Sequence, residues 1–235
     1  MKILAIETSA GIASVALRAD GHTVGEFTLQ TKKTHSEILM PMVDALLHAA
    51  NLQIQDVDLL ASSGGPGSFT GVRIGAATIL GLAFGRELPC IGVSTLYALA
   101  FGAAAGMGDD VLLSPVMDAR HGNFYNALFV VKDGVPVRLC EDRLIHGDEL
   151  AAELQKENTK KIYIAGDGCE AFLCYGAPVL PVPERLRYQS AASVAAAAEK
   201  IFSESEDPGA FTDAAFRPSY IRPSQAERER MERMK

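Results

Sequence analysis

The sequence predicts an α/β fold built from two similar lobes. Apolar stretches typical of strands alternate with amphipathic stretches typical of helices along the whole chain. An apolar strand that ends in an acidic residue occurs twice, at Glu7 and 111 positions later at Asp118. An Asp-Gly turn follows in each half, beginning at Asp20 and at Asp133. At 235 residues the chain is long enough to give each half its own core.

The first half predicts three antiparallel strands followed by alternating helices and strands. The strands are expected over 2–9, 13–19 and 23–30, with the Asp-Gly pair as a hairpin turn. Residues 35–52 form an amphipathic helix with apolar positions spaced for one face. A buried strand over 57–65 runs into a glycine-rich loop, and a second helix covers 70–86. A strand over 88–96 then leads to an alanine-rich helix.

The second half repeats this order. Strands are expected over 112–120, 123–131 and 135–145, then a helix over 147–157, a strand over 161–168 and a helix over 189–202 capped by Ser190 or Ser193. Two copies of one pattern indicate duplicated lobes that face each other across a cleft, as in actin, sugar kinases and Hsp70. We predict an actin-like (ribonuclease H-like) fold, with a mixed five-stranded sheet in each lobe. The lobes are placed at 1–105 and 106–220, with a charged tail at 221–235.

Composition limits the function. The net charge is −7, and an acidic chain binds nucleic acid poorly on its own. From Arg217 onward, however, six basic residues face three acidic ones. The tail is therefore either a nucleic-acid contact or a solvated helical end with mixed charges. The four cysteines form no C-x-x-C pair and are expected to be reduced core thiols. No stretch is apolar enough for a signal peptide or a membrane span, so a cytoplasmic location is expected.

The loop "GGPGSFTG" resembles a phosphate-binding loop but lacks its chemistry. A Walker loop ends in Gly-Lys-Ser/Thr, whereas Gly71 is followed by Val72. Backbone N–H groups at a helix N-terminus still suit an anion in general. The alternative is that the glycines permit unusual backbone angles and close strand–helix packing. The candidate anion or nucleotide loop comprises Gly64, Gly65, Gly67, Ser68 and Thr70.

No metal site or catalytic group is predicted. His35 opens the first amphipathic helix, but a helical metal pair needs a second histidine four residues on, where Leu39 stands. No G-x-S-x-G elbow is present. Glu7 and Asp118 are either a carboxylate pair across the cleft or strand-end groups that accept backbone hydrogen bonds.

The second predicted helix is rich in small residues. Gly71 and Gly75, then Gly81 and Gly85, recur four residues apart. Such spacing flattens one side of a helix and lets another helix approach closely. With the apolar face of the first helix, it predicts a helical docking face. The alternative is that these small residues pack inside the same lobe. Gly75→Leu is expected to disrupt a complex while leaving the subunit folded.

Several motifs carry a family resemblance. They are "ILAIETSAGIASVAL", "THSEILMPMVDALL", "GGPGSFTGVRIGAATILGLAFG", "VSTLYALA", "MDARHGNFYNALF" and "PSYIRPSQAE". Together they resemble the bacterial TsaB (YeaZ) family of tRNA threonylcarbamoyladenosine biosynthesis proteins, from Met1 to about Glu227. The resemblance implies a paralogue of the catalytic subunit TsaD, which carries two helical metal-binding histidines where this sequence has His35 and Leu39. It therefore implies a non-catalytic subunit.

The resemblance also implies partners. The family binds TsaD through a bundle of the first two helices of each subunit. With the ATPase TsaE, that complex transfers threonylcarbamoyl to the adenosine beside the anticodon of tRNAs reading codons that start with A. The interface is expected to draw on His35, Ile38, Leu39, Met42, Leu46, Gly71, Gly75, Thr78 and Leu82. A homodimer is expected when the chain is alone, and ATP or ADP only in the assembled complex.

Two alternative functions remain open. The first is an ATP-dependent kinase or ATPase that acts on its own, which rests on Glu7, Asp118 and the glycine-ended strands. The second is a metal-dependent peptidase, which rests on paralogy alone.

Overall fold

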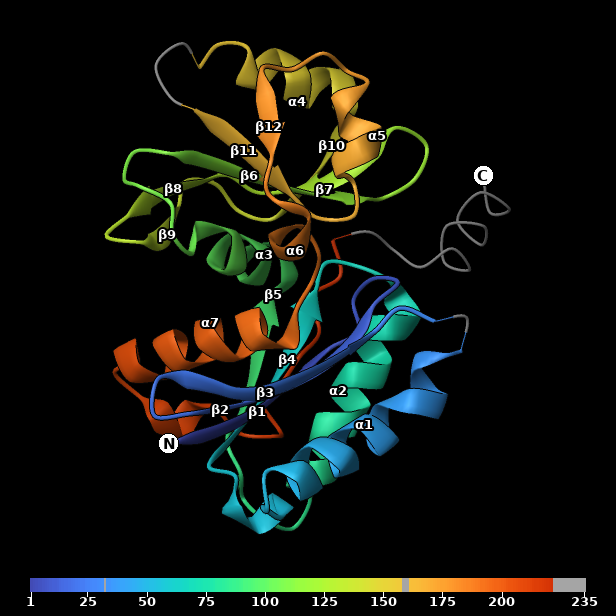
Figure 1. Cartoon of the computed structure of the whole chain (residues 1–235), viewed down its shortest axis with the longest axis vertical. Helices are drawn as coiled ribbons and strands as arrows, with labels where there is room; N and C mark the ends of the chain where they lie inside the picture. Colours follow the sequence, from blue (N-terminus) through green and yellow to red (C-terminus); the bar gives the residue numbers. More distant parts are fainter. Residues whose placement is uncertain (32, 158–160, 222–235) are drawn as a thin grey trace.

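A computed structural model describes residues 1–31, 33–157 and 161–221 of the chain. These residues form two β-sheets, one above the other in Figure 1, with helices between the sheets and on their outer sides. The strands of the first sheet lie within residues 2–94 and those of the second within 112–181. The duplicated α/β arrangement is therefore confirmed. The predicted tail at 221–235 lies outside the described residues, except for its first residue.

Over the described residues the first sheet has five strands in the order β3-β2-β1-β4-β5. The first three form the predicted antiparallel meander. β4 then pairs in parallel with β1, and β5 in parallel with β4, each following a helix. Asp20 and Gly21 both take positive φ in the hairpin turn. The mixed five-stranded sheet is as predicted. The bounds are β1 (Lys2–Glu7), β2 (Ala13–Ala19), β3 (His22–Leu29), β4 (Leu59–Gly65) and β5 (Cys90–Ser94).

The second sheet has seven strands among the described residues, which corrects the predicted five. The two strands expected over 123–131 and 135–145 are each broken in two. The first break lies opposite Ser114 and Pro115, where the side-chain Nδ2 of Asn126 donates to Ser114 Oγ and to the Pro115 carbonyl, both at 2.9 Å. Since proline has no N–H, a regular ladder is interrupted there. The bounds are β6 (Leu112–Asp118), β7 (Asn123–Asn126), β8 (Phe129–Lys132), β9 (Val135–Arg138), β10 (Arg143–His146), β11 (Ile162–Ala165) and β12 (Val179–Pro181).

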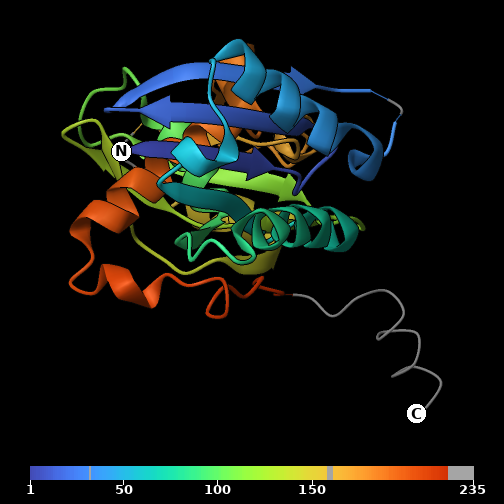
Figure 2. The same ribbon diagram turned by 90° about the horizontal axis from the view of Figure 1, so that it is seen from below.

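Helices cover both sides of the first sheet. In both views α1 (His35–Ala49) and α2 (Phe69–Ala83) lie along one face (Figures 1 and 2), where they share a single core with β1, β2 and β4. On the other face α7 (Ala191–Glu204) packs on β1 and β2, although its sequence belongs to the second half. The lobe boundaries at 105 and 220 therefore stay predictions.

The remaining helices belong to the second lobe and to the layer between the sheets. Between the sheets, α3 (Thr95–Ala104) packs on both α7 and the second sheet. Gly102 of α3 lies directly against Ser193 of α7, so the two helices approach closely. No helix in the described part of the chain is both long and apolar enough to cross a bilayer. The shorter elements are α4 (Gly147–Leu154), α5 (Cys169–Leu173), α6 (Glu184–Arg187) and the 3-10 turns η1 (Ile54–Asp56) and η2 (Pro208–Ala210).

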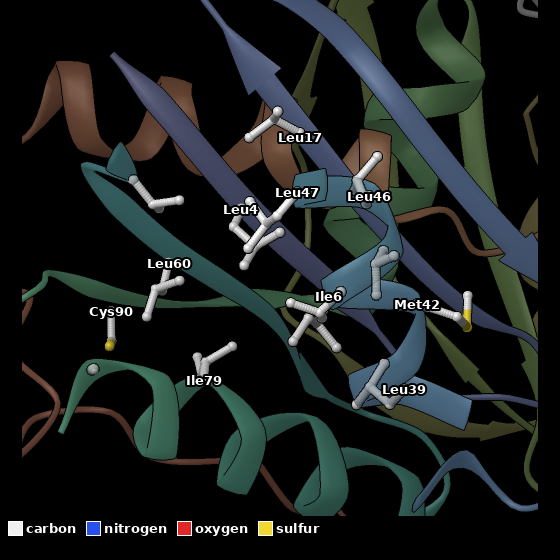
Figure 3. Packing of buried hydrophobic residues seen from close by; sticks show 14 of the residues in the cluster. Leu4, Ile6, Leu17, Leu39, Met42, Leu46, Leu47, Leu60, Ile79 and Cys90 are labelled. Carbon is white, nitrogen blue, oxygen red and sulfur yellow. The ribbon is translucent and has the colours of Figure 1, made fainter. Parts of the chain in front are cut away.

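The core of the first lobe explains the helical periodicity of α1. Leu39, Met42 and Leu46 of α1 belong to one hydrophobic cluster with Leu4 and Ile6 of β1 (Figure 3), and all five are buried. From α2, Ile79 joins the same cluster, as do Leu60 and Cys90 from the neighbouring strands. The apolar stripe of α1 is therefore occupied by its own sheet.

The four cysteines differ in burial, and their reactivity with an alkylating reagent tests that difference. Burial raises the pKa of Cys90 to about 11 and that of Cys169 to about 12, whereas Cys174 is exposed and Cys140 is half-buried. The expectation of four core thiols is therefore wrong for Cys174. Because the thiolate is the species that reacts, iodoacetamide at pH 8 should label Cys174 first and spare Cys90 and Cys169 in the native chain. Peptide mass spectrometry measures this, and early labelling of Cys90 would contradict the buried position.

Candidate functional site

The glycine-rich loop after β4 is packed against the chain's own backbone. A Cβ atom on Gly65 would overlap the carbonyl oxygen of Ser219, and one on Gly67 would overlap that of Ser9. Both glycines have positive φ. The N–H of Ser68 donates to the Ser9 carbonyl at 2.7 Å. These positions require glycine because of close backbone approach rather than because of a ligand.

The end of the loop fixes the start of α2. The Ser68 hydroxyl accepts a hydrogen bond from the N–H of Gly71 and caps the helix. Thr8 Oγ1 donates to the Gly71 carbonyl at 2.8 Å, and a Cβ on Gly71 would overlap the Thr8 carbonyl oxygen. Gly64 packs against Gly92 of β5, while Thr70 is exposed. The candidate loop residues thus serve the joint between β4 and α2.

A C-terminal segment also covers this loop. The Ser219 N–H donates to the Gly64 carbonyl at 2.7 Å, and the Tyr220 ring lies 5.0 Å from that of Phe69. Arg73 lies over the Phe69 ring and donates from Nε to the Tyr220 hydroxyl at 3.1 Å. Sequence reasoning missed this segment, since residues 211–221 show no helical or strand period. The aromatic Tyr220 between two prolines was the available signal.

The two strand-end acids have structural partners. Glu7 is buried, and its Oε1 accepts from the Ser9 N–H at 2.5 Å and from Ser63 Oγ at 3.1 Å. Asp118 accepts from the Arg120 N–H at 2.7 Å. Of the two interpretations left open by the sequence, backbone-accepting strand ends are therefore confirmed.

A third acid, Asp167, interacts electrostatically with both Glu7 and Asp118. Burial raises the pKa of Glu7, and the charge of Asp167 adds to that rise. Desolvation raises the pKa of Asp167, although the residue is exposed, and the charge of Asp118 adds to that rise. Glu7 Oε2 has no hydrogen-bond partner within the described residues. Asp167 follows β11, and its position after the strand "IYIA" was the sequence signal for it.

His35 and Leu39 do not form a ligand pair. His35 is the first residue of α1, and partial burial lowers its pKa. Leu39 is 1% exposed in the core. Across the described residues no group of three or more His, Cys, Asp or Glu side chains is placed to hold a metal ion.

Most of the predicted interface residues are buried within the chain, and their place in an interface stays a prediction. Ile38, Leu39, Met42 and Leu46 are buried in the core under α1, because its apolar stripe faces the sheet. Gly71 and Gly75 are buried against β1 and β4. His35, Thr78 and Leu82 keep partial exposure.

Gly75→Leu is therefore the wrong probe of an interface. A Cβ on Gly75 would lie 2.6 Å from Thr8 Oγ1 and 2.7 Å from Ser62 Oγ. The substitution would unsettle the subunit itself.

The solvent side of the same two helices carries small and apolar residues. We call Met40 and Ala45 of α1, with Ala77, Gly81 and Phe84 at the end of α2, the outer helix face; all five are exposed. Phe84 is 80% exposed. A groove of about 690 Å³ adjoins this face between the end of α1, η1 and Leu82. The face offers exposed small side chains, an adjoining groove and one exposed aromatic ring.

Comparisons with known proteins cover most of the chain. The family model described as "TsaD: tRNA N6-adenosine threonylcarbamoyltransferase" matches residues 24–228. The "tRNA threonylcarbamoyladenosine biosynthesis protein TsaB" of Escherichia coli (strain K12) is 41% identical over 157 residues, which is 67% of this chain and 64% of that protein. The protein of the same name from Bacillus subtilis (strain 168) is 36% identical over 167 residues, 71% of each chain.

A solved structure agrees. A Pseudomonas aeruginosa protein, described as uncharacterized with similarity to peptidase YeaZ, superposes with a TM-score of 0.81 at 26% identity, over 94% of this chain and 99% of that one. This likeness, with the repeated strand order, confirms the predicted actin-like fold. The chain belongs to the TsaB family of tRNA threonylcarbamoyladenosine biosynthesis proteins, as its motifs predict.

Proposed function

We propose that this chain is a non-catalytic subunit that binds TsaD and supports formation of N6-threonylcarbamoyladenosine beside the anticodon of tRNAs reading codons that start with A. The observation that carries the proposal is Gly81. It lies in an exposed turn of α2, and a Cβ added there meets nothing within 4 Å in the described structure. A glycine inside a helix costs up to about 1 kcal/mol relative to alanine. Unlike Gly71 and Gly75, Gly81 gains no packing among the described residues that offsets this cost.

A partner helix would account for that glycine. Ala77 precedes Gly81 by one turn, and Ala45 of α1 is also exposed, so the outer helix face is low enough for a second backbone to approach. Phe84 then supplies the large aromatic anchor that interfaces favour at their centre. The docking surface thus uses the solvent side of α1 and α2, whereas most of the residues predicted for it lie on the core side.

The polar groups between the lobes support a non-catalytic role. Glu7 and Asp118 accept backbone hydrogen bonds, and the glycine loop packs against backbone atoms of the same chain. Leu39, the position of the second histidine by the family resemblance, lies in the core. In this proposal TsaE joins the larger complex, ATP or ADP binds only after assembly, and tRNA is contacted indirectly or through the tail. The chain would act in the cytoplasm.

Reconstitution tests the proposal. Purified TsaD, TsaE, tRNA and a threonylcarbamoyl donor system are combined with or without this chain, and modified adenosine is scored. Gly81→Arg should abolish co-elution with TsaD and the gain in modified adenosine, because the side chain blocks close approach. Gly108→Arg is the matched control, since Gly108 is exposed, lies in the α3–β6 connection and has open space for a side chain.

The outcomes separate the alternatives. If Gly81→Arg folds normally and still co-elutes with TsaD, the outer helix face is not the interface. If the chain alone binds ATP with magnesium and turns it over in calorimetry, the kinase or ATPase alternative replaces this proposal.

A further inference from the structure

Arg73 is the single charged residue of α2. It is exposed and lies one turn before Ala77 on the solvent side of the helix. Residues three or four positions apart share one side of a helix. Along this side follow Arg73, Ala77, Gly81 and Phe84. Arg73 therefore extends the outer helix face by one turn and gives it its only charge on α2.

The C-terminal segment holds the Arg73 side chain in place. Its guanidinium carbon lies 3.8 Å from the centre of the Phe69 ring and 5.6 Å from that of Tyr220, and a cation is attracted to such ring faces. Arg73 Nε also donates to the Tyr220 hydroxyl at 3.1 Å. Tyr220 is anchored in turn, because Phe216 is buried in the core of the first lobe and the Ser219 N–H binds the glycine loop. The direction of the guanidinium is thus set by a residue 147 positions away in the chain.

These contacts use only one of the five N–H donors of the guanidinium. Nη1 and Nη2 carry the other four, and they form no hydrogen bond or ion pair with any residue that the structure describes. The planar fork of Nη1 and Nη2 matches the two oxygens of a carboxylate or a phosphate. Since the side chain is already held, it loses little freedom when it binds such a group. Arg73 is therefore built as a receptor for one anionic group.

The chemistry of the surrounding surface favours a carboxylate over the phosphates of RNA. A partner helix on the outer helix face would remove Nη1 and Nη2 from water, and a desolvated charge without a partner is strongly unfavourable. The partner must therefore supply an acceptor at this point. An RNA backbone carries a charge on every nucleotide and needs several cations, whereas α2 offers one and α1 exposes the acids Glu37 and Asp44. A single carboxylate on a protein helix fits this pattern of charge.

We propose that Arg73, held by Tyr220, binds an aspartate or glutamate side chain of TsaD through Nη1 and Nη2 and thereby sets the direction in which a TsaD helix docks along α2. The proposal rests on the proposed function. From Arg73 to Phe84 the side of α2 is about 16 Å long. A helix lying on it meets a cation at one end, small residues in the middle and an aromatic ring at the other end. Because the two ends differ, only one direction of the partner helix pairs its carboxylate with Arg73.

Calorimetric titration of the full chain with purified TsaD tests the proposal. Arg73→Met keeps an unbranched apolar stem on the Phe69 ring and removes the fork, so it should raise Kd by at least about tenfold. Arg73→Lys keeps the charge without the fork and should bind with an intermediate Kd. Arg185→Met is the matched control, since Arg185 is an exposed residue of α6 in the second lobe, and it should leave Kd unchanged. An Arg73→Met chain that binds TsaD as the parent does overturns the proposal.

A double-mutant cycle identifies the carboxylate and separates pairing from any loss of folding in one variant. Each exposed aspartate and glutamate on the helices of TsaD that bind this chain is replaced by alanine. One of these replacements should weaken binding to the parent and have no further effect on binding to Arg73→Met. If every replacement acts equally on both chains, no TsaD carboxylate pairs with Arg73 and the proposal is wrong.

Tyr220→Phe distinguishes the cation from the segment that holds it. The variant keeps the ring and removes the hydroxyl that accepts from Arg73 Nε. The guanidinium then has more freedom to lose on binding, so Kd should rise a few-fold, which is less than with Arg73→Met. A rise as large as that of Arg73→Met would mean that TsaD recognises the C-terminal segment rather than the cation, and would refute the proposal.

Comparison with Gly81→Arg separates this proposal from the proposed function. If Gly81→Arg fails to co-elute with TsaD while Arg73→Met binds as the parent does, the role of Arg73 is refuted and the proposed function stands. If Gly81→Arg still co-elutes, the outer helix face is not the interface and both fail. If Arg73→Met keeps its affinity for TsaD but weakens tRNA binding by the assembled complex, the acceptor is an RNA phosphate, which refutes the assignment of a carboxylate.

Discussion

Gly71→Ala is expected to destabilise the chain by about 1–3 kcal/mol, whereas Gly81→Ala in the same helix should stabilise it by up to about 1 kcal/mol. At Gly71 the new methyl group would overlap the carbonyl oxygen of Thr8. That oxygen belongs to the backbone just after β1, between the first sheet and the loop, and it moves only if the sheet end moves. At Gly81 the described structure leaves open space, so alanine removes backbone entropy from the unfolded chain without any clash.

Urea unfolding of the two variants and the parent measures this contrast. Because both changes add one methyl group to one helix, they differ mainly in what surrounds the site. Equal effects of the two substitutions would mean that α2 does not pack on the end of β1 as described.

The free energy of unfolding should fall as pH rises through the titration of Glu7, and Glu7→Gln should remove most of that fall. Burial raises the pKa of Glu7 above its ordinary value of 4.5. Above pH 4.5 the unfolded chain loses this proton while the folded chain holds it, so the folded state binds more protons. Stability therefore decreases from pH 4.5 up to the raised pKa, by at most about 1.4 kcal/mol per pH unit for one proton, and then levels off.

Glutamine keeps the acceptor used by the Ser9 N–H and Ser63 Oγ and needs no ionisation. The variant should thus exceed the parent in stability at pH 7.5 by about 1–3 kcal/mol and match it near pH 4. Asp167 has a pKa raised in the same direction, so a small residual slope in the variant belongs to it. Asp118→Asn, at the exposed strand end of the second lobe, is the control for loss of one carboxylate. A parent whose stability is flat from pH 4.5 to 8 would contradict a buried Glu7 carboxyl group.

The duplication of the two lobes could be predicted from the sequence because it depends on local residue patterns. Asp20-Gly21 and Asp133-Gly134 both adopt positive φ, as an Asp-Gly hairpin requires. The spacing of Glu7 and Asp118 placed two equivalent strands, and both end where the acids stand. What local patterning missed was the interruption of the second meander, because it depends on Pro115 in the neighbouring strand.

Residue periodicity could not predict which side of α1 and α2 is free to bind a partner. Ile38, Leu39, Met42 and Leu46 form an apolar stripe whether the stripe meets a partner or the chain's own sheet. The same holds for Gly71 and Gly75, whose spacing equals that of an interface motif. Their neighbours are Thr8, just after β1, and Ser62 of β4.

By itself the sequence determined the duplicated α/β fold, the family and the positions of the turns, because turn chemistry, strand ends and apolar period act between residues close in the chain. Only the tertiary structure decided which helix residues remain free, that Asp167 of the second lobe adds to the raised pKa of Glu7 in the first, and that Tyr220 of the C-terminal segment holds Arg73 of α2. Those properties depend on contacts between residues tens to hundreds of positions apart, and a side chain's own type does not say which neighbour will cover it.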